Sequence, residues 1–140
     1  ALKETLKVGV CFIKPNMNEL YDISEKEIQH EAQQEIIASE LIYEGKTAFA
    51  VVSLGAAGVL LVSKDHTERI NAPVVPIKSK VGAGDSMVAG IVYKLSQGSA
   101  VRDAVIYGVA AGSAAVMTPG SALCRREDTE ALYERIQQRY

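Results

Sequence analysis

The sequence has few of the residues that mark secreted or metal-binding proteins. Its 140 residues include two cysteines, Cys11 and Cys124, and two histidines, His30 and His66. The cysteines lie far apart and form no CxxC pair, so we expect reduced thiols in a cytosolic protein. Both histidines stand in polar surroundings, which favours solvated side chains over metal ligands.

Long apolar runs and an excess of one charge are also missing. No apolar run reaches the roughly 18 residues of a transmembrane helix, and no signal-peptide pattern precedes the first strand. The net charge is −2, so the composition favours neither nucleic acid nor an anionic membrane as a partner. Hydrophobic residues at 48% and charged residues at 23% are instead usual for a globular domain with a core.

The sequence does not begin with a methionine. The chain begins ALKETLKVGV, enters an apolar run almost at once, and ends on a helical pattern. We therefore expect residues 1–140 to be part of a larger α/β protein.

The apolar pattern predicts strands and helices in an α/β order. Short apolar runs predict strands at 7–13, 47–54, 59–63 and 67–70. Longer patterns predict helices at 25–43, 85–95, 100–117 and 127–138, with one helical turn at 18–21. A strand and helix, then a cluster of strands, then three helices predict a layered α/β architecture.

Local signals predict where several helices begin and end. Ser24 and Glu27 form a capping-box pattern, and Ser99 is a candidate cap. Gly45 and Gly98 are expected to end helices. The inward face of the 25–43 helix is predicted to carry Ile28, Ala32, Ile36 and Leu41.

The run VGAGDSMVAG carries the first chemical signal. Gly82, Ala83 and Gly84 are expected to form a turn that opens a helix, where free backbone N–H groups make an anion site. Asp85 in such a turn can take a proton from a substrate hydroxyl. The alternative is a plain glycine turn with Asp85 as the helix N-cap. GxGxxG and P-loop patterns are both absent.

The segment KPNMNE follows the first strand and carries the second signal. A strand end delivers Lys14 to the carboxyl edge of the sheet, where it can pair with phosphate. Asn16 and Glu19 can hold Mg²⁺ and its waters. The alternative is a capped turn after a strand.

Two glycine-containing segments complete the candidate set. The stretch Ser53, Leu54, Gly55, Ala56, Ala57 and Gly58 either lets a ligand approach the backbone or forms a plain hairpin turn. In residues 108–120, GVAAGSAAVMTPG, small side chains allow close packing, either of helix on helix or of helix on a flat ring. A structural role is favoured there.

Taken together and in this order, these motifs resemble the ribokinase-like family of PfkB-type sugar kinases. The matching elements are KPNMNEL, VVSLGAAGVLLV, VGAGDSMVAG and GVAAGSAAVMTPGSALC. The resemblance implies a ribokinase-like layered α/β/α fold, of which residues 1–140 would be the C-terminal, nucleotide-binding part, without the N-terminal half and its lid. The stretch from Ser79 onward is most similar to bacterial 6-phosphofructokinases of the PfkB type.

The resemblance implies transfer of the ATP γ-phosphoryl group to a sugar-phosphate hydroxyl. Asp85 would be the base, and residues 82–84 the anion hole. Lys14 and Asn16 would contact the ATP phosphates, and Asn16 and Glu19 would tune Mg²⁺ binding. Residues 53–58 would line the nucleotide. Two residues would sit beside the adenine: Val109 and Ser113.

Further implications concern a monovalent cation, the substrate and the parent protein. Ligands for K⁺ would come mostly from the backbone carbonyls of Ser79, Val81, Ala115, Thr118 and Gly120. The loop KSKVGAGD is shorter than in similar sequences, and Thr118 stands where some carry Asn.

The parent would be a cytoplasmic homodimer, and the isolated fragment would show little turnover. Other interpretations stay open: a 1-phosphofructokinase, a tagatose-6-phosphate kinase, a less favoured ribokinase or nucleoside kinase, or a nucleotide-binding module without catalysis.

Overall fold

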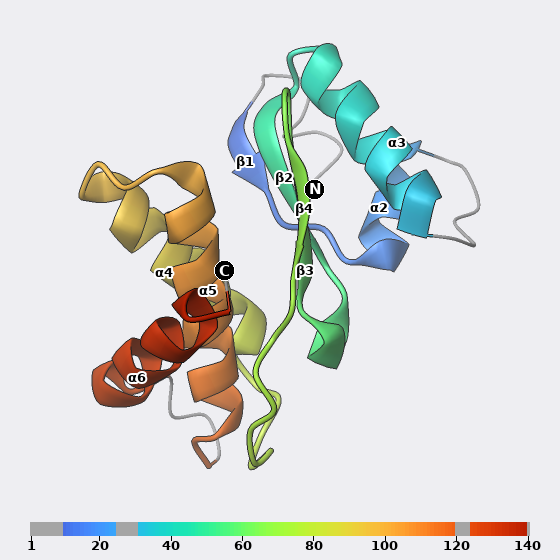
Figure 1. Cartoon of the computed structure of the whole chain (residues 1–140). Coiled ribbons are helices and arrows are strands. Elements are labelled where there is room, and N and C mark those ends of the chain that lie inside the picture. Colours follow the sequence, from blue (N-terminus) through green and yellow to red (C-terminus); the bar gives the residue numbers. More distant parts are fainter. Residues whose placement is uncertain (1–9, 25–30, 120–123, 140) are drawn as a thin grey trace. The chain divides into compact units, whose positions relative to one another are not determined.

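The computed structural model describes residues 10–24, 31–119 and 124–139 (Figure 1). The chain divides into two compact units, Ala1–Arg69 and Ile70–Tyr140. Within the described residues, the first unit contains a sheet with two α-helices, and the second contains three α-helices. The predicted α/β content is therefore confirmed.

The sheet has four strands in the order β1-β2-β3-β4. Their bounds are β1 Val10–Ile13, β2 Thr47–Ser53, β3 Val59–Ser63 and β4 Thr67–Ile70. β1 runs parallel to β2, and β2 runs antiparallel to β3. The predicted strands are confirmed, with β2 ending one residue early; residues 7–9 lie outside the described part of the chain.

Helices α2 (Met17–Ser24) and α3 (Glu31–Tyr43) lie on one face of this sheet (Figure 1). Together with the strands they form an apolar core: Ile13, Leu20, Ile37, Ala38, Leu41, Ala50, Val52, Leu60 and Val62. The helical turn predicted at 18–21 was too short, because α2 has eight residues. The predicted pairing of Ser24 with Glu27 lies outside the described residues.

The predicted inward face of α3 was partly wrong. Ile36 is 58% exposed, whereas the buried side chains are Gln34, Ile37, Ala38 and Leu41. These positions recur every three or four residues, which places them on one stripe of the helix. Leu41 was therefore assigned correctly, and Ile36 belongs to the outer face. The side chains of residues 28 and 32 lie outside the described set.

Two predicted helix ends are confirmed. After α3, Gly45 has φ 75° and donates its N–H to the carbonyl of Ile42 at 3.0 Å. In the second unit, Gly98 has φ 81° and donates to Leu95 at 3.0 Å. Both glycines take a left-handed conformation that residues with a Cβ adopt only at a cost.

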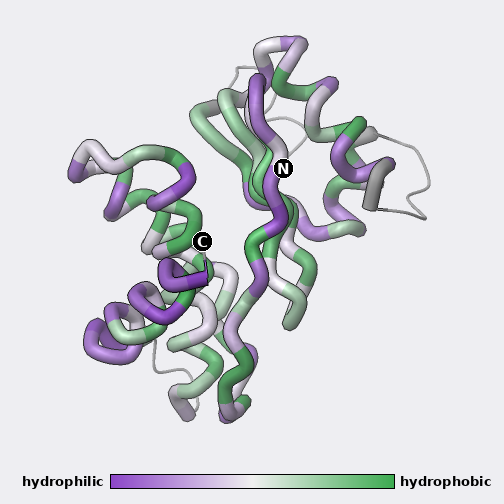
Figure 2. The backbone as a smooth tube through the Cα atoms, in the orientation of Figure 1, coloured by the Kyte–Doolittle hydropathy of each residue, from purple (hydrophilic) through white to green (hydrophobic). Residues whose placement is uncertain are grey.

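The second unit consists of α4 (Ala83–Ser96), α5 (Val101–Val116) and α6 (Arg126–Gln137), with α5 packed against both others. The three predicted helices are confirmed to within two residues at each end. The predicted cap at Ser99 was wrong: the N-cap of α5 is Ala100, which makes no side-chain cap bond. Figure 2 shows that α6 is largely hydrophilic, in keeping with its sequence REDTEALYERIQ.

Glycines let α4 and α5 approach closely. A Cβ added at Gly108 would lie 2.5 Å from Ile91 Cγ1 and 2.8 Å from the carbonyl oxygen of Met87. At Gly90 it would lie 3.1 Å from Ala111 Cβ. Gly108 and Ala111 therefore serve the packing of helix on helix, which supports the structural interpretation for this part of the segment.

A lysine and a group of tyrosines join the three helices near the C-terminal end of α4. Lys94 Nζ lies 4.9 Å from the ring centroid of Tyr107 and 5.0 Å from that of Tyr133. The rings of Tyr107 and Tyr133 meet edge to face at 5.1 Å, and Tyr93 lies 5.7 Å from Tyr107. These contacts hold the end of α4 against α5 and α6.

Two absences predicted from the sequence can be compared with the described residues. None of their helices is long and apolar enough to cross a membrane. Both cysteines are free thiols. His66 Nε2 lies 3.0 Å from Glu68 Oε2 at an exposed turn, whereas His30 lies outside the described residues.

Candidate functional site

In the first unit, the turn after β1 is tied to the end of β2. The N–H of Ser53 donates to the carbonyl of Pro15 at 2.9 Å, and the Ser53 hydroxyl lies 3.5 Å from the same oxygen. The KPN turn and the SLGAAG turn are thus joined where two parallel strands end. Lys14 stands between β1 and this junction and is half-buried. Carboxyl ends of parallel strands are where α/β proteins bind ligands.

Asn16 and Glu19 bond to each other's backbone. Asn16 Oδ1 accepts the N–H of Glu19 at 2.8 Å, and Glu19 Oε1 accepts the N–H of Asn16 at 3.1 Å. This is a reciprocal capping box at the start of α2. The capped-turn alternative is therefore confirmed. Each side chain nevertheless keeps a polar atom that these two bonds do not use. Both residues are exposed, and the bonds leave Asn16 Nδ2 and Glu19 Oε2 available.

The glycine turn between β2 and β3 is one turn of 3-10 helix, η1 (Gly55–Ala57). Gly55 has φ 63° and Gly58 has φ 106°, both of which favour glycine. The turn closes through the N–H of Leu54, which donates to the carbonyl of Gly58 at 2.9 Å. Ala56 and Ala57 are exposed. The turn does connect a hairpin, and its small side chains leave the backbone open on the surface.

In the second unit, the first turn of α4 presents backbone N–H groups. Gly82 is the N-cap in a left-handed conformation, with φ 78°. The helical hydrogen bonds begin when Ser86 N–H donates to the Gly82 carbonyl at 2.9 Å. The N–H groups of Ala83, Gly84 and Asp85 precede this ladder, so they are the ones that a helix start offers to an anion.

Asp85 lies inside the helix, which changes two expectations. Ala83 and Gly84 belong to the first helical turn rather than to a separate glycine turn. The alternative that Asp85 is the N-cap is wrong, because Gly82 holds that position without any side-chain cap bond. The carboxylate of Asp85 is exposed. It can therefore act on a bound molecule beside the N–H groups of its own turn.

Ser86 is a polar residue that the sequence analysis did not single out. It is 3% exposed, and its Oγ has no hydrogen-bond partner among the described residues. A buried hydroxyl without a partner is unusual in a folded protein. The signal that could have found it is its place in the sequence, directly after Asp85 on the buried side of α4.

Residues predicted to hold a monovalent cation also come together in the second unit. The N–H groups of Lys78 and Ser79 donate to the carbonyl of Val116 at 2.6 and 3.2 Å. This places the loop before α4 against the C-terminal end of α5. Val81 and Thr118 lie in these two segments, and Ala115 is in the last turn of α5. Gly120 lies outside the described residues.

The residues predicted beside the adenine both lie on α5. Val109 is 1% exposed and Ser113 is 8% exposed. Their contact with a base stays a prediction. The predicted set as a whole falls into two groups, one in each unit: Lys14 to Gly58, and Ser79 to Thr118.

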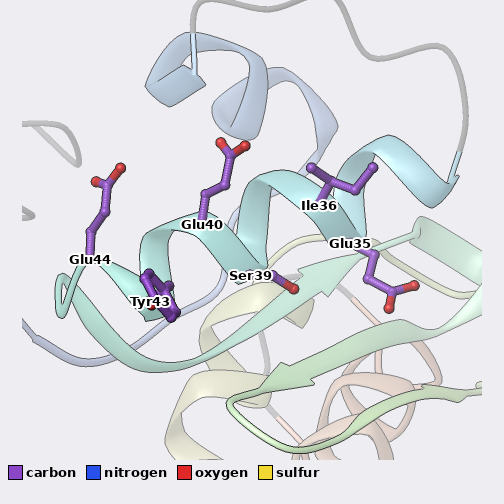
Figure 3. Close-up of a pocket in the computed structure, with 6 residues that line it drawn as sticks. All are labelled: Glu35, Ile36, Ser39, Glu40, Tyr43 and Glu44. Atoms are coloured by element: carbon purple, nitrogen blue, oxygen red, sulfur yellow. The ribbon is translucent and has the colours of Figure 1, made fainter.

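A pocket on α3 contains none of the predicted residues. It is lined by Glu35, Ile36, Ser39, Glu40, Tyr43 and Glu44 (Figure 3). All six side chains come from α3 and its C-terminal turn. Within the described ranges, no three His, Cys, Asp or Glu residues gather as a metal site would require.

The fold is shared with a solved sugar kinase. The crystal structure of phosphofructokinase-2 from Escherichia coli in complex with potassium matches with a TM-score of 0.94 and 36% identity, over 98% of this chain and 45% of that one. This likeness confirms the predicted fold class, that of the ribokinase-like α/β kinases.

The family model described as pfkB family carbohydrate kinase matches residues 1–128, so the chain belongs to that family. The ATP-dependent 6-phosphofructokinase isozyme 2 of Escherichia coli K12 is 37% identical over 134 residues, which are 95% of this chain and 43% of the relative. The 1-phosphofructokinase of Borreliella burgdorferi is 30% identical over 94% of this chain and 42% of its own length. The chain thus spans less than half the length of these relatives.

Proposed function

We propose that the chain is the C-terminal, nucleotide-binding part of an ATP-dependent kinase that phosphorylates a hydroxyl of a sugar phosphate. The foremost candidate reaction converts fructose 6-phosphate to fructose 1,6-bisphosphate. One observation carries the proposal: the first turn of α4 holds three N–H groups that precede the helical ladder, with the carboxylate of Asp85 exposed beside them. Family membership supplies the reaction class.

In this proposal the chain's residues divide the work of phosphoryl transfer. The substrate hydroxyl oxygen forms a bond to the γ-phosphorus of ATP as the bond between that phosphorus and the ADP oxygen breaks. Asp85 accepts the hydroxyl proton, and the N–H groups of residues 83–85 stabilise charge on the migrating phosphoryl group. Such positioning and charge stabilisation supply most of the catalysis in this reaction.

Other predicted residues would contact the rest of the nucleotide. Lys14 would pair with phosphate oxygens as a point charge. The open backbone of residues 53–58 would pass along the nucleotide, held in register with the KPN turn by the bond from Ser53 to Pro15. Val109 and Ser113 of α5 would flank the adenine.

The capping box fits a role for Mg²⁺. Glu19 keeps one carboxylate oxygen free of backbone bonds, and Mg²⁺ binds few protein ligands while keeping waters and substrate phosphates. Glu19 would therefore hold the ion through one oxygen, directly or through water, and Asn16 would orient its waters. When bound, the ion would neutralise phosphate charge.

The potassium site implied by the resemblance fits less well. Among the ligands that the resemblance implies, the carbonyl of Ala115 already accepts a hydrogen bond from the Thr118 N–H. No step of the proposed reaction is therefore assigned to K⁺.

The proposal also covers the sugar that accepts the phosphoryl group and the larger protein to which the chain would belong. Residues that read the sugar would lie in the part of the relatives that this chain does not span, so we expect little turnover from the 140 residues alone. The parent would be a cytoplasmic homodimer. The 1-phosphofructokinase and tagatose-6-phosphate kinase activities are the alternatives, and a panel of fructose 6-phosphate, fructose 1-phosphate and tagatose 6-phosphate separates them.

The test replaces the matching portion of the Escherichia coli isozyme 2 with this chain and compares Asp85→Asn with Asp65→Asn. Asp65 is exposed at the turn between β3 and β4, so its change is the matched control. We expect Asp85→Asn to lose a factor of about 10² to 10⁴ in kcat, as essential acid–base groups do.

Calorimetric titration of ATP into the 140-residue chain supplies the second measurement. Binding should change little in Asp85→Asn, because the N–H groups remain. A hybrid whose kcat is insensitive to Asp85→Asn would favour the alternative of a nucleotide-binding module without catalysis.

A further inference from the structure

The loop before α4 is anchored on both sides of Lys80. The N–H groups of Lys78 and Ser79 donate to the carbonyl of Val116, and the N–H of Val81 donates to Ser79 Oγ at 3.2 Å. Gly82 then caps the helix. The backbone of Lys80 is therefore fixed within a few residues of the N–H groups that begin α4.

The carbonyls at the end of α5 are already occupied by the protein's own donors. Ala114 accepts the Thr118 hydroxyl at 3.0 Å, and Ala115 accepts the Thr118 N–H at 3.1 Å. Val116 accepts two N–H groups, which uses both lone pairs of its oxygen. A dehydrated monovalent cation at this end of α5 would have to compete with these bonds.

Lys80 carries a positive charge in the loop that is anchored at this end of α5. Its side chain is exposed and has no ion-pair or hydrogen-bond partner within the described part of the chain. A lysine has a flexible four-carbon stem and three donors, which suits it to bind phosphate as a point charge. The buried Ser86 hydroxyl, which lacks a partner among the described residues, is a second polar group of the same turn.

We propose that the Lys80 ammonium binds the phosphate charge at the N-terminus of α4 and does there what a bound monovalent cation would otherwise do. The inference rests on the proposed function, since it assumes that phosphoryl groups bind at this turn. It concerns the loop KSKVGAGD, in which Lys80 stands two residues before the N-cap Gly82. Its consequence is binding of the nucleotide without a requirement for K⁺.

The test is calorimetric titration of the 140-residue chain with MgATP and, separately, with inorganic tripolyphosphate, which lacks the base. Each is measured in KCl and in tetramethylammonium chloride at equal ionic strength. For the unchanged chain we expect dissociation constants that agree within about twofold between the salts. Lys80→Met should weaken both ligands about tenfold in tetramethylammonium, in line with a lost charge-assisted hydrogen bond. Potassium should restore part of that loss.

Two further variants keep the test sharp. Lys80→Arg should retain most of the binding because it keeps the charge. Lys64→Met, at the exposed turn after β3, is the matched control and should bind as the unchanged chain does.

Three outcomes would overturn the inference. They are a strong K⁺ requirement in the unchanged chain, equal binding by Lys80→Met and Lys64→Met, and equal losses in Lys80→Arg and Lys80→Met at unchanged melting temperature. If no form binds MgATP or tripolyphosphate in either salt, the proposed function itself fails.

Discussion

The two units use their motifs in different ways. In the first unit, the motif side chains build the local structure: Asn16 and Glu19 cap α2, and Ser53 ties one turn to another. In the second unit, Gly82 begins α4 without any side-chain cap bond. The first N–H groups of the helix are therefore not bonded by a cap, and Asp85 beside them is exposed. The motif of the first unit therefore builds structure through its side chains, whereas that of the second unit leaves backbone groups open.

The largest effect on stability is expected at Gly108, where α4 and α5 pack closely because glycine has no Cβ. Gly108→Ala would place a Cβ 2.8 Å from the Met87 carbonyl, which is backbone and cannot move aside as a side chain can. We expect a loss of about 2 to 3 kcal/mol in the free energy of unfolding, measured by denaturant unfolding followed by circular dichroism. Gly112→Ala is the matched control, because its Cβ would meet the Ala83 carbonyl at 3.2 Å. Equal costs at the two positions would contradict the packing argument.

The capping box tests whether the first unit's motif is structural. Asn16→Ala and Glu19→Ala should each lower the free energy of unfolding by about 1 kcal/mol, the usual cost of losing a helix cap. The double variant should cost less than the sum, since the two bonds depend on one another. Asn18→Ala, exposed on the same helix, is the control. If Asn16 and Glu19 acted only on ligands, stability would stay constant.

Glu19→Gln separates the two roles of that residue. It keeps an oxygen that can accept the Asn16 N–H, but it removes the charge. We expect near-normal stability with weaker Mg²⁺ dependence of ATP binding. Loss of both together would mean that cap and ligand roles cannot be separated.

A smaller effect is expected at Lys94. Lys94→Met removes the cation from the rings of Tyr107 and Tyr133, which should cost about 0.5 to 1 kcal/mol at this partly exposed site. Lys94→Arg should retain most of the stability, because a guanidinium can also lie over an aromatic ring. Equal losses in both variants would assign the effect to packing rather than to charge.

The smallest expected effect is a loss of stability at alkaline pH through Tyr107 and Tyr133; it is absent at neutral pH. Burial, then the charge of Glu130, raises the pKa of Tyr107 above its ordinary 10.0. Burial, then the charge of Asp103, raises the pKa of Tyr133. The unfolded chain therefore releases these protons first, so stability is complete below about pH 10 and falls as the pH rises through the higher folded values.

That pH dependence can be checked by unfolding between pH 8 and about 11. Tyr107→Phe and Tyr133→Phe should each flatten the decline. The comparison is best made in the Lys94→Met background, which removes the ammonium that lies over both rings. An unchanged slope in both phenylalanine variants would contradict the assignment.

Local sequence predicted much of the fold but missed some details. Strands with consecutive apolar residues, such as 59–63, and glycine stops such as Gly45 were correct, because they depend on neighbours along the chain. Ile36 was placed inward incorrectly, since which apolar stripe of a helix is buried depends on what packs against it. The cap at Ala100 was missed because no side chain signals it.

The candidate site was likewise predictable in part from the sequence, and in part only from the fold. The sequence by itself determined the motifs, and with them the family, because KPNMNEL and VGAGDSMVAG stand in a recognisable order along the chain. Only the tertiary structure decided what those residues bond to. The sequence left a capped turn at Asn16 and Glu19 as one of two alternatives, and the structure supplied the two bonds that form the cap. The anchoring of Lys78 and Ser79 on Val116 had no signal in the sequence. Hydrogen-bond partners depend on which backbone groups are left unpaired, and folding alone determines that.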